Sequence, residues 1–160
     1  MKFTKLAAAA GVLSFVASAA FAQTATQVVT FQVNAINQIS VSGAPSLTIS
    51  AAVAGSAPTS VTSNVSTWAV TTNQSTAKIT GSLSAPMPAG LTLSANLSAP
   101  AGATSAGLTG LSAGAVDLVT GITMLNASGL GLSYQLDATS AAGVIASSTR
   151  TVTYTITGGV

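Results

Sequence analysis

The chain has 160 residues, of which 48% are hydrophobic, and it contains no cysteine, no histidine and only six charged side chains. Charged residues make up 4% of the sequence, whereas an ordinary soluble domain carries about 25%. This shortage excludes most enzyme mechanisms and metal sites, which need clusters of His, Cys, Asp or Glu. We therefore expect a non-enzymatic chain with no catalytic residues, no metal and no cofactor.

Residues 1–22 have the three parts of a secretory signal peptide. Two lysines give the positive start, residues 6–16 form the apolar run, and the small residues Ala20 and Ala22 mark a cleavage site. A buried helix or a membrane span is the alternative, but the run is shorter than the roughly 20 residues that a span needs. We expect a bacterial protein that crosses the periplasm and is secreted or displayed at the cell surface. The mature chain, residues 23–160, would then be a single domain without a membrane span.

Cleavage of this signal changes the charge of the chain. The remaining charged side chains are Lys78, Arg150, Asp117 and Asp137, so the net charge falls close to zero. Two cations cannot neutralise the phosphates of a nucleic acid, and we expect no nucleic-acid partner. A net charge near zero removes the repulsion between copies and favours association.

Alternation of apolar and polar residues predicts a series of short strands along the mature chain. The clear ones cover residues 27–34, 91–98, 130–138 and 151–157, and weaker ones cover residues 39–42, 47–53, 67–72, 78–83 and 116–120. Turns rich in glycine and proline separate them. Residues 113–119 fit either a strand or a short helical turn, and residues 99–114 lack large side chains and fit a long surface loop or an irregular edge. Eight or nine short strands with one-sided alternation predict an all-β antiparallel β-sandwich, Ig-like or pilin-like, in preference to a parallel sheet.

The strands at the two ends of the mature chain are the candidate interaction sites. Their apolar positions are Val29, Phe31 and Val33 in the first strand and Val152, Tyr154 and Ile156 in the last. Natural sheets protect their edges with lysine, other charges and proline, but the mature chain has one lysine and neither strand contains proline. We expect strand-edge pairing with copies of itself or with related surface subunits. The segment 23–34 either pairs with a neighbouring subunit or completes its own sheet.

The mature aromatic residues favour the core over a binding platform for carbohydrate. They are Phe31, Trp68, Tyr134 and Tyr154, and each occupies the apolar phase of its predicted strand. If the last two predicted strands pair as a hairpin, the two tyrosines share a face and become neighbours. The same alternation argues against a salt bridge between Asp137 and Arg150, which lie on opposite phases.

The mature region opens with Val-Thr-Phe-Gln-Val and closes with Thr-Val-Thr-Tyr-Thr-Ile-Thr. In this it resembles small secreted bacterial β-sandwich surface proteins, such as fimbrial-type and spore-coat-U-type subunits. The resemblance implies a structural subunit of a surface layer, fibre or matrix, although the chain differs from those subunits in lacking a cysteine pair. The alternatives are an adhesin or carbohydrate-binding module that uses Trp68 or residues 99–114, an ice-binding threonine array at residues 151–157, and a small outer-membrane β-barrel.

Overall fold

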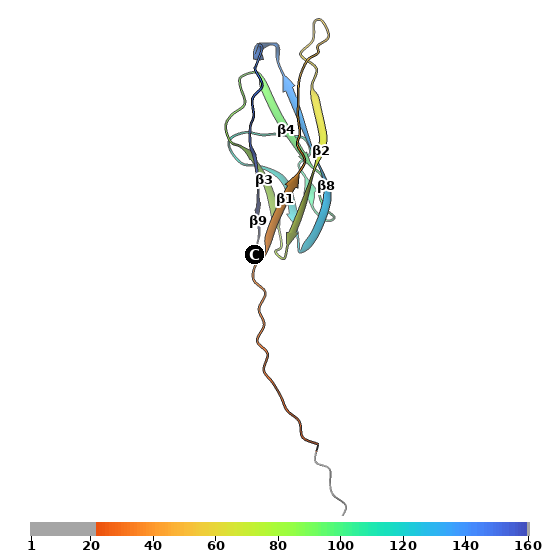
Figure 1. Cartoon of the computed structure of the whole chain (residues 1–160), viewed down its shortest axis with the longest axis vertical. Coiled ribbons are helices and arrows are strands. Elements are labelled where there is room, and N and C mark those ends of the chain that lie inside the picture. The colour runs from red at the N-terminus through yellow and green to blue at the C-terminus, as the bar shows by residue number, and fades with distance from the viewer. Residues whose placement is uncertain (1–21, 160) are drawn as a thin grey trace, which may run out of the picture. The chain divides into compact units, whose positions relative to one another are not determined.

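The computed structural model describes residues 22–159, and nearly all of their regular structure is β-strand (Figure 1). Residues up to Gln32 and residues from Val33 onward form two separate units. No strand lies in the described part of the first unit, residues 22–32. The predicted signal peptide, residues 1–22, lies outside the described residues except for its last position. No helix in residues 22–159 is long and apolar enough to cross a membrane.

Nine strands lie in the second unit. They are β1 (Asn37–Ser42), β2 (Val61–Thr72), β3 (Ala77–Leu83), β4 (Leu91–Leu97), β5 (Thr104–Ser105), β6 (Thr109–Gly110), β7 (Val116–Ile122), β8 (Leu125–Ala138) and β9 (Val152–Thr157). A single 3-10 turn, η1 (Ser140–Ala142), lies between β8 and β9.

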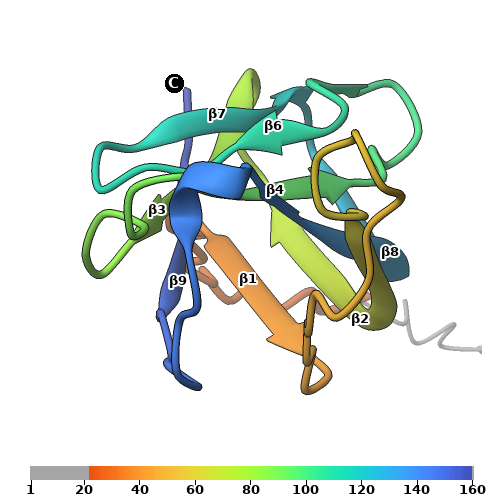
Figure 2. The same cartoon turned by 90° about the horizontal axis from the view of Figure 1, so that it is seen from above.

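The strands form two open antiparallel sheets, as Figure 2 shows from above. One sheet has the order β1-β2-β8-β4-β6 and the other has the order β5-β7-β3-β9. The predicted all-β, antiparallel, sandwich-like architecture is therefore confirmed, with five strands facing four. The strands do not join into one closed sheet.

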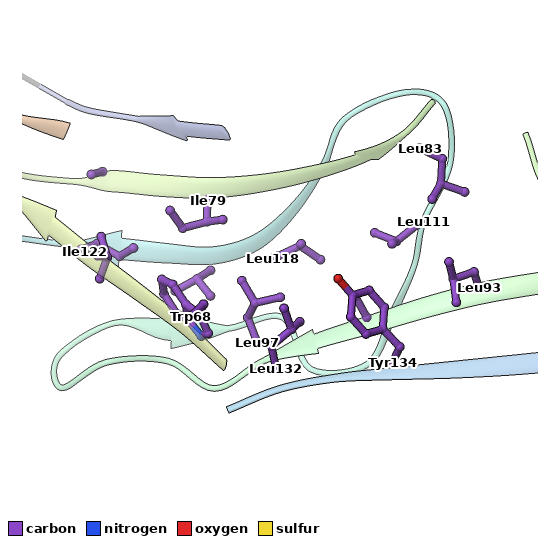
Figure 3. Packing of buried hydrophobic residues seen from close by; sticks show 14 residues of the cluster. Trp68, Ile79, Leu83, Leu93, Leu97, Leu111, Leu118, Ile122, Leu132 and Tyr134 are labelled. Carbon is purple, nitrogen blue, oxygen red and sulfur yellow. The ribbon is translucent and has the colours of Figure 1, made fainter. Parts of the chain in front are cut away.

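The core between the sheets is built from inward positions of the central strands. Its largest fully buried side chains are Trp68, Ile79, Leu97, Leu118, Val119, Ile122 and Leu132 (Figure 3). They belong to β2, β3, β4, β7 and β8, whose alternation places one apolar face against the opposite sheet. A Cβ atom at Gly81 in β3 would lie 2.6 Å from Cδ1 of Leu118, so a larger residue there would require the Leu118 side chain to shift. No residue of β1 or β9 is fully buried.

Two predicted strands are wrong. Residues 27–34 form no strand in the structure, because alternation supplies the pattern of a strand but a ladder also needs a partner. Residues 47–53 also form no strand, and the only pairing in that region is an isolated bridge from Ala52 to Pro58. Leu47 packs against the core and Ile49 is half-buried, but Ala51, Ala52 and Val53 are exposed, so apolar burial does not continue along the segment. Of the ambiguous residues 113–119, residues 116–119 lie in β7 and residues 113–115 precede it without a helical turn.

The hairpin considered as one arrangement of the last two strands does not form. β8 pairs with β2 and β4, whereas β9 pairs with β3 in the other sheet. The connection at residues 139–151 therefore crosses from one sheet to the other.

Residues 99–114 close one side of the sandwich. They contain β5, which pairs with β7, and β6, which pairs with β4, so the segment supplies an edge strand to each sheet. Leu111 from this segment is buried in the core. Of the two predictions for residues 99–114, an irregular edge describes the structure better than a long surface loop.

Candidate assembly edges

The side of the sandwich opposite residues 99–114 has two long edge strands, β1 and β9. They lie near each other in both views (Figures 1 and 2). No strand within residues 22–159 pairs with the outer edge of either one. Six residues of each strand therefore stand at an open edge, with no proline among them and no charged side chain.

The register fixes which main-chain groups of β9 point outward. The N–H of Ser84, directly after β3, donates to the carbonyl of Thr151 at 2.9 Å, and the N–H of Thr151 donates to the Ser84 hydroxyl at 3.1 Å. Thr151 therefore turns its main-chain groups toward the β3 side. Because hydrogen-bonded and non-hydrogen-bonded positions alternate along an antiparallel ladder, Val152, Tyr154 and Ile156 turn their N–H and C=O groups toward the open edge.

The same reasoning applies to β1. The N–H of Asn73 donates to the carbonyl of Ile36 at 3.2 Å, which sets the alternation with β2. The main-chain groups of Asn37, Ile39 and Val41 then face the outer edge of β1. Each edge thus offers a row of donors and acceptors that a further strand can use.

The inward side chains along these edges are covered less than those of the central strands. Val152, Tyr154 and Ile156 are only half-buried, although Ile79 beside Ile156 on β3 is completely buried. On β1, Val41 is 48% exposed, although it alternates with the outward-facing residues and its side chain belongs to the core-facing side of the strand. The core is therefore incompletely covered on this side.

The N-terminal segment carries an unburied apolar row. Val29, Phe31 and Val33 are 72%, 88% and 77% exposed, and Val28 of the opposite phase is 93% exposed. The prediction that Phe31 lies in the core is therefore wrong for this structure. Soluble monomeric proteins rarely expose several large apolar side chains together, and where they do, the exposed patch usually marks a site of interaction.

Asn73, at the end of β2, holds the residues that lead into β1. Its Oδ1 accepts from the N–H of Ile36 at 2.7 Å, and its Nδ2 donates to the carbonyl of Asn34 at 2.8 Å. β9 ends at the same place, since a Cβ atom on Gly158 would lie 2.5 Å from Nδ2 of Asn37. The start of β1 and the end of β9 therefore meet there.

Tyr134 and Tyr154 join the two sheets. The Tyr154 hydroxyl donates to the Tyr134 hydroxyl at 2.7 Å, from β9 to β8, and Figure 3 shows the Tyr134 hydroxyl directed toward the opposite sheet. Burial raises the pKa of both hydroxyls, and for Tyr154 the hydrogen bond and the nearby Tyr134 raise it further, whereas the hydrogen bond lowers that of Tyr134 in part. The tyrosines are therefore neighbours across the sandwich, and not through a hairpin of the last two strands.

The few charged side chains do not form a site. Lys78 pairs with Asp117 at 2.9 Å on the outer face of the four-stranded sheet, and both side chains are about half exposed. Asp137 accepts from Ser60 and Gln135, while Arg150 donates to the carbonyls of Pro86 and Thr149. Asp137 and Arg150 thus have different partners and do not pair with each other. Within residues 22–159, no group of three or more His, Cys, Asp or Glu side chains could hold a metal ion.

The carbohydrate platform expected as an alternative at Trp68 is not available. Trp68 is 1% exposed and its Nε1 is buried without a hydrogen-bond partner. The two open depressions described on the surface, one near Met124 and one near Gly131, are lined by no ionisable side chain.

The last predicted strand was a candidate interaction site from the sequence, and as β9 it lies at an open edge. The open edge of β1 was missed, because strand order decides which strands lie at an edge. The hydrogen bonds of the Asn73 side chain and the ion pair of Lys78 with Asp117 were also missed, because no sequence pattern predicts these contacts. Comparison of the chain with protein-family models, with curated proteins and with solved structures finds no match.

Proposed function

We propose that this chain is an exported, non-enzymatic structural subunit, of fimbrial-like or pilin-like type, of a bacterial surface layer, fibre or matrix. It assembles with copies of itself by pairing at strand edges, and residues 23–34 act as the added strand. The observation that carries the proposal is the coexistence of an exposed alternating row, Val29, Phe31 and Val33, with long unpaired edges on the folded unit.

Physical chemistry supports this use of the segment. Burying a valine or phenylalanine side chain contributes about 1.5–3 kcal/mol, and added main-chain hydrogen bonds provide affinity while alternate side chains provide specificity. The near absence of charge on the mature chain removes electrostatic repulsion between copies. The carbohydrate-binding alternative is weaker, because its aromatic candidate, Trp68, lies inside the core.

The test compares two substitutions in the same segment. Phe31→Ser removes an apolar side chain from the proposed inward row, whereas Val28→Ser removes one from the opposite phase. We expect the unchanged mature chain and the Val28 variant to form polymers in electron micrographs and fast-sedimenting material in the ultracentrifuge. The Phe31 variant should stay monomeric and folded. A mature chain that stays monomeric at high concentration would refute the proposal.

A further inference from the structure

We infer that the acceptor of the added strand is the open edge of β9 in a second copy. The segment binds antiparallel to β9, and Phe31 lies opposite Tyr154. This inference rests on the proposed function and adds to it the acceptor, the direction and the register.

The numbers of strands favour β9 over β1 as the acceptor. The sheet that ends in β9 has four strands and the sheet that faces it has five. A strand added beside β9 equalises the two sheets and covers the half-buried Val152, Tyr154 and Ile156. A strand added beside β1 would extend the sheet that is already longer and leave β9 open.

Phase and length fix the register. Val152, Tyr154 and Ile156 present their main-chain N–H and C=O groups at the open edge of β9, and the same three residues direct their side chains toward the core. A partner strand must therefore place inward side chains at its own hydrogen-bonded positions, directly opposite them. Antiparallel pairing of residues 28–33 with Val152–Thr157 meets this condition. It places Val29, Phe31 and Val33 opposite Ile156, Tyr154 and Val152.

A slip of one residue would turn Thr30 and Gln32 toward the core and the apolar row toward water, which disfavours it strongly. The chosen register also brings the Phe31 and Tyr154 rings together as a cross-strand aromatic pair. All strand pairs within the sandwich are antiparallel, and the added pair continues that pattern.

The strand in this register must come from another copy. Asn73 holds the carbonyl of Asn34 at the end of the sandwich where β9 finishes. Val152 lies six residues before Gly158, about 20 Å away along an extended strand. Val33 is four residues from Asn37 and four residues span at most about 14 Å, so Val33 cannot reach Val152 of its own chain. Donor and acceptor are different surfaces, so the contact is heterologous and generates an open chain of subunits unless the rotation closes a ring.

Disulfide trapping tests this arrangement, because the protein has no cysteine of its own. Thr30 and Thr155 would form a non-hydrogen-bonded pair with Cα atoms about 4.5 Å apart, and Thr155 has an exposed side chain. Mature chains carrying Thr30→Cys are mixed with chains carrying Thr155→Cys and oxidised mildly. We expect a disulfide-linked dimer of one chain of each kind, seen by non-reducing electrophoresis and located by mass spectrometry.

Control variants separate the possible outcomes. Thr153→Cys shifts the acceptor by two residues and should cross-link to the Thr30 variant much less than Thr155→Cys does. Ser40→Cys on β1 should not cross-link. Preferred linkage to Ser40→Cys, disulfides between two Thr155→Cys chains, or a disulfide inside one chain carrying both cysteines would overturn the inference.

The two proposals fail differently. If polymers form but Thr30 and Thr155 do not cross-link, the assignment of β9 is wrong while the proposed function stands. If the mature chain forms no polymer by sedimentation, the proposed function fails first.

Discussion

Raising the pH above 10 should unfold the sandwich through Tyr134 and Tyr154, the only two tyrosines in the chain. Their hydroxyls hydrogen-bond between the sheets, and burial raises the pKa of each above the ordinary value of 10.0. Below pH 10 both tyrosines are protonated in the folded and unfolded chains. Above pH 10 the unfolded chain loses these protons first, so the free energy of unfolding falls as the pH rises.

The size of the effect follows from proton linkage. A tyrosine that stays protonated only in the folded chain lowers the unfolding free energy by at most about 1.4 kcal/mol for each pH unit above 10. The two together lower it by at most about 2.7 kcal/mol per unit, and by less for the half-buried Tyr154, because solvent screens it. A single domain is stable by about 5–15 kcal/mol, so one to two pH units remove a large part of its stability.

Urea unfolding at several pH values measures the slope, and tyrosinate absorbance reports ionisation in the same samples. We expect the absorbance to rise together with loss of β-sheet circular dichroism. The double variant Tyr134→Phe/Tyr154→Phe is the control: it removes both hydroxyls at little cost in stability, and its alkaline slope should be shallower. Full ionisation near pH 10 in a chain that stays folded would refute the inter-sheet hydrogen bond.

Four further results are expected. Trp68→Ala should lower the unfolding free energy by about 3–5 kcal/mol in chemical denaturation, because it empties a fully buried position; a loss below 1 kcal/mol would contradict the core. Lys78→Ala should change it by only about 0–1 kcal/mol, because its ion pair is half exposed. Asn73→Ala should lower it by about 0.5–1.5 kcal/mol, because two exposed main-chain groups lose their side-chain hydrogen-bond partner and are left to water. The mature chain should resist trypsin, since Lys78 and Arg150 are its only basic side chains; many fragments would mean that the expected cleavage of the signal is wrong.

Alternation predicted most of the sheet strands because it reports which face of a strand is buried. β3, β4 and β9 closely match the predicted ranges, and β8 starts at Leu125, earlier than the predicted strand. The short edge strands β5 and β6 were not predicted, because a strand of two residues is too short to show an alternation of apolar and polar side chains.

Pairing was harder to predict than strand identity. A hairpin between the last two strands would have made the two tyrosines neighbours, but they meet across the sandwich instead, because residues 139–151 change sheets. Both arrangements place the tyrosines on inward phases, so alternation alone does not distinguish them. The segment 27–34 has the same pattern as the real strands, and only the structure shows that it forms no strand among the described residues 22–159.

Amide hydrogen exchange on assembled and monomeric protein examines the open edge itself. In monomers of the Phe31→Ser variant, the N–H groups of Val152, Tyr154 and Ile156 should exchange quickly, while those of Thr153 and Thr155, bonded to β3, exchange slowly. In polymers of the unchanged mature chain, the first three should become slow as well. Fast exchange of these three amides in polymers would show that copies associate without adding a strand to β9.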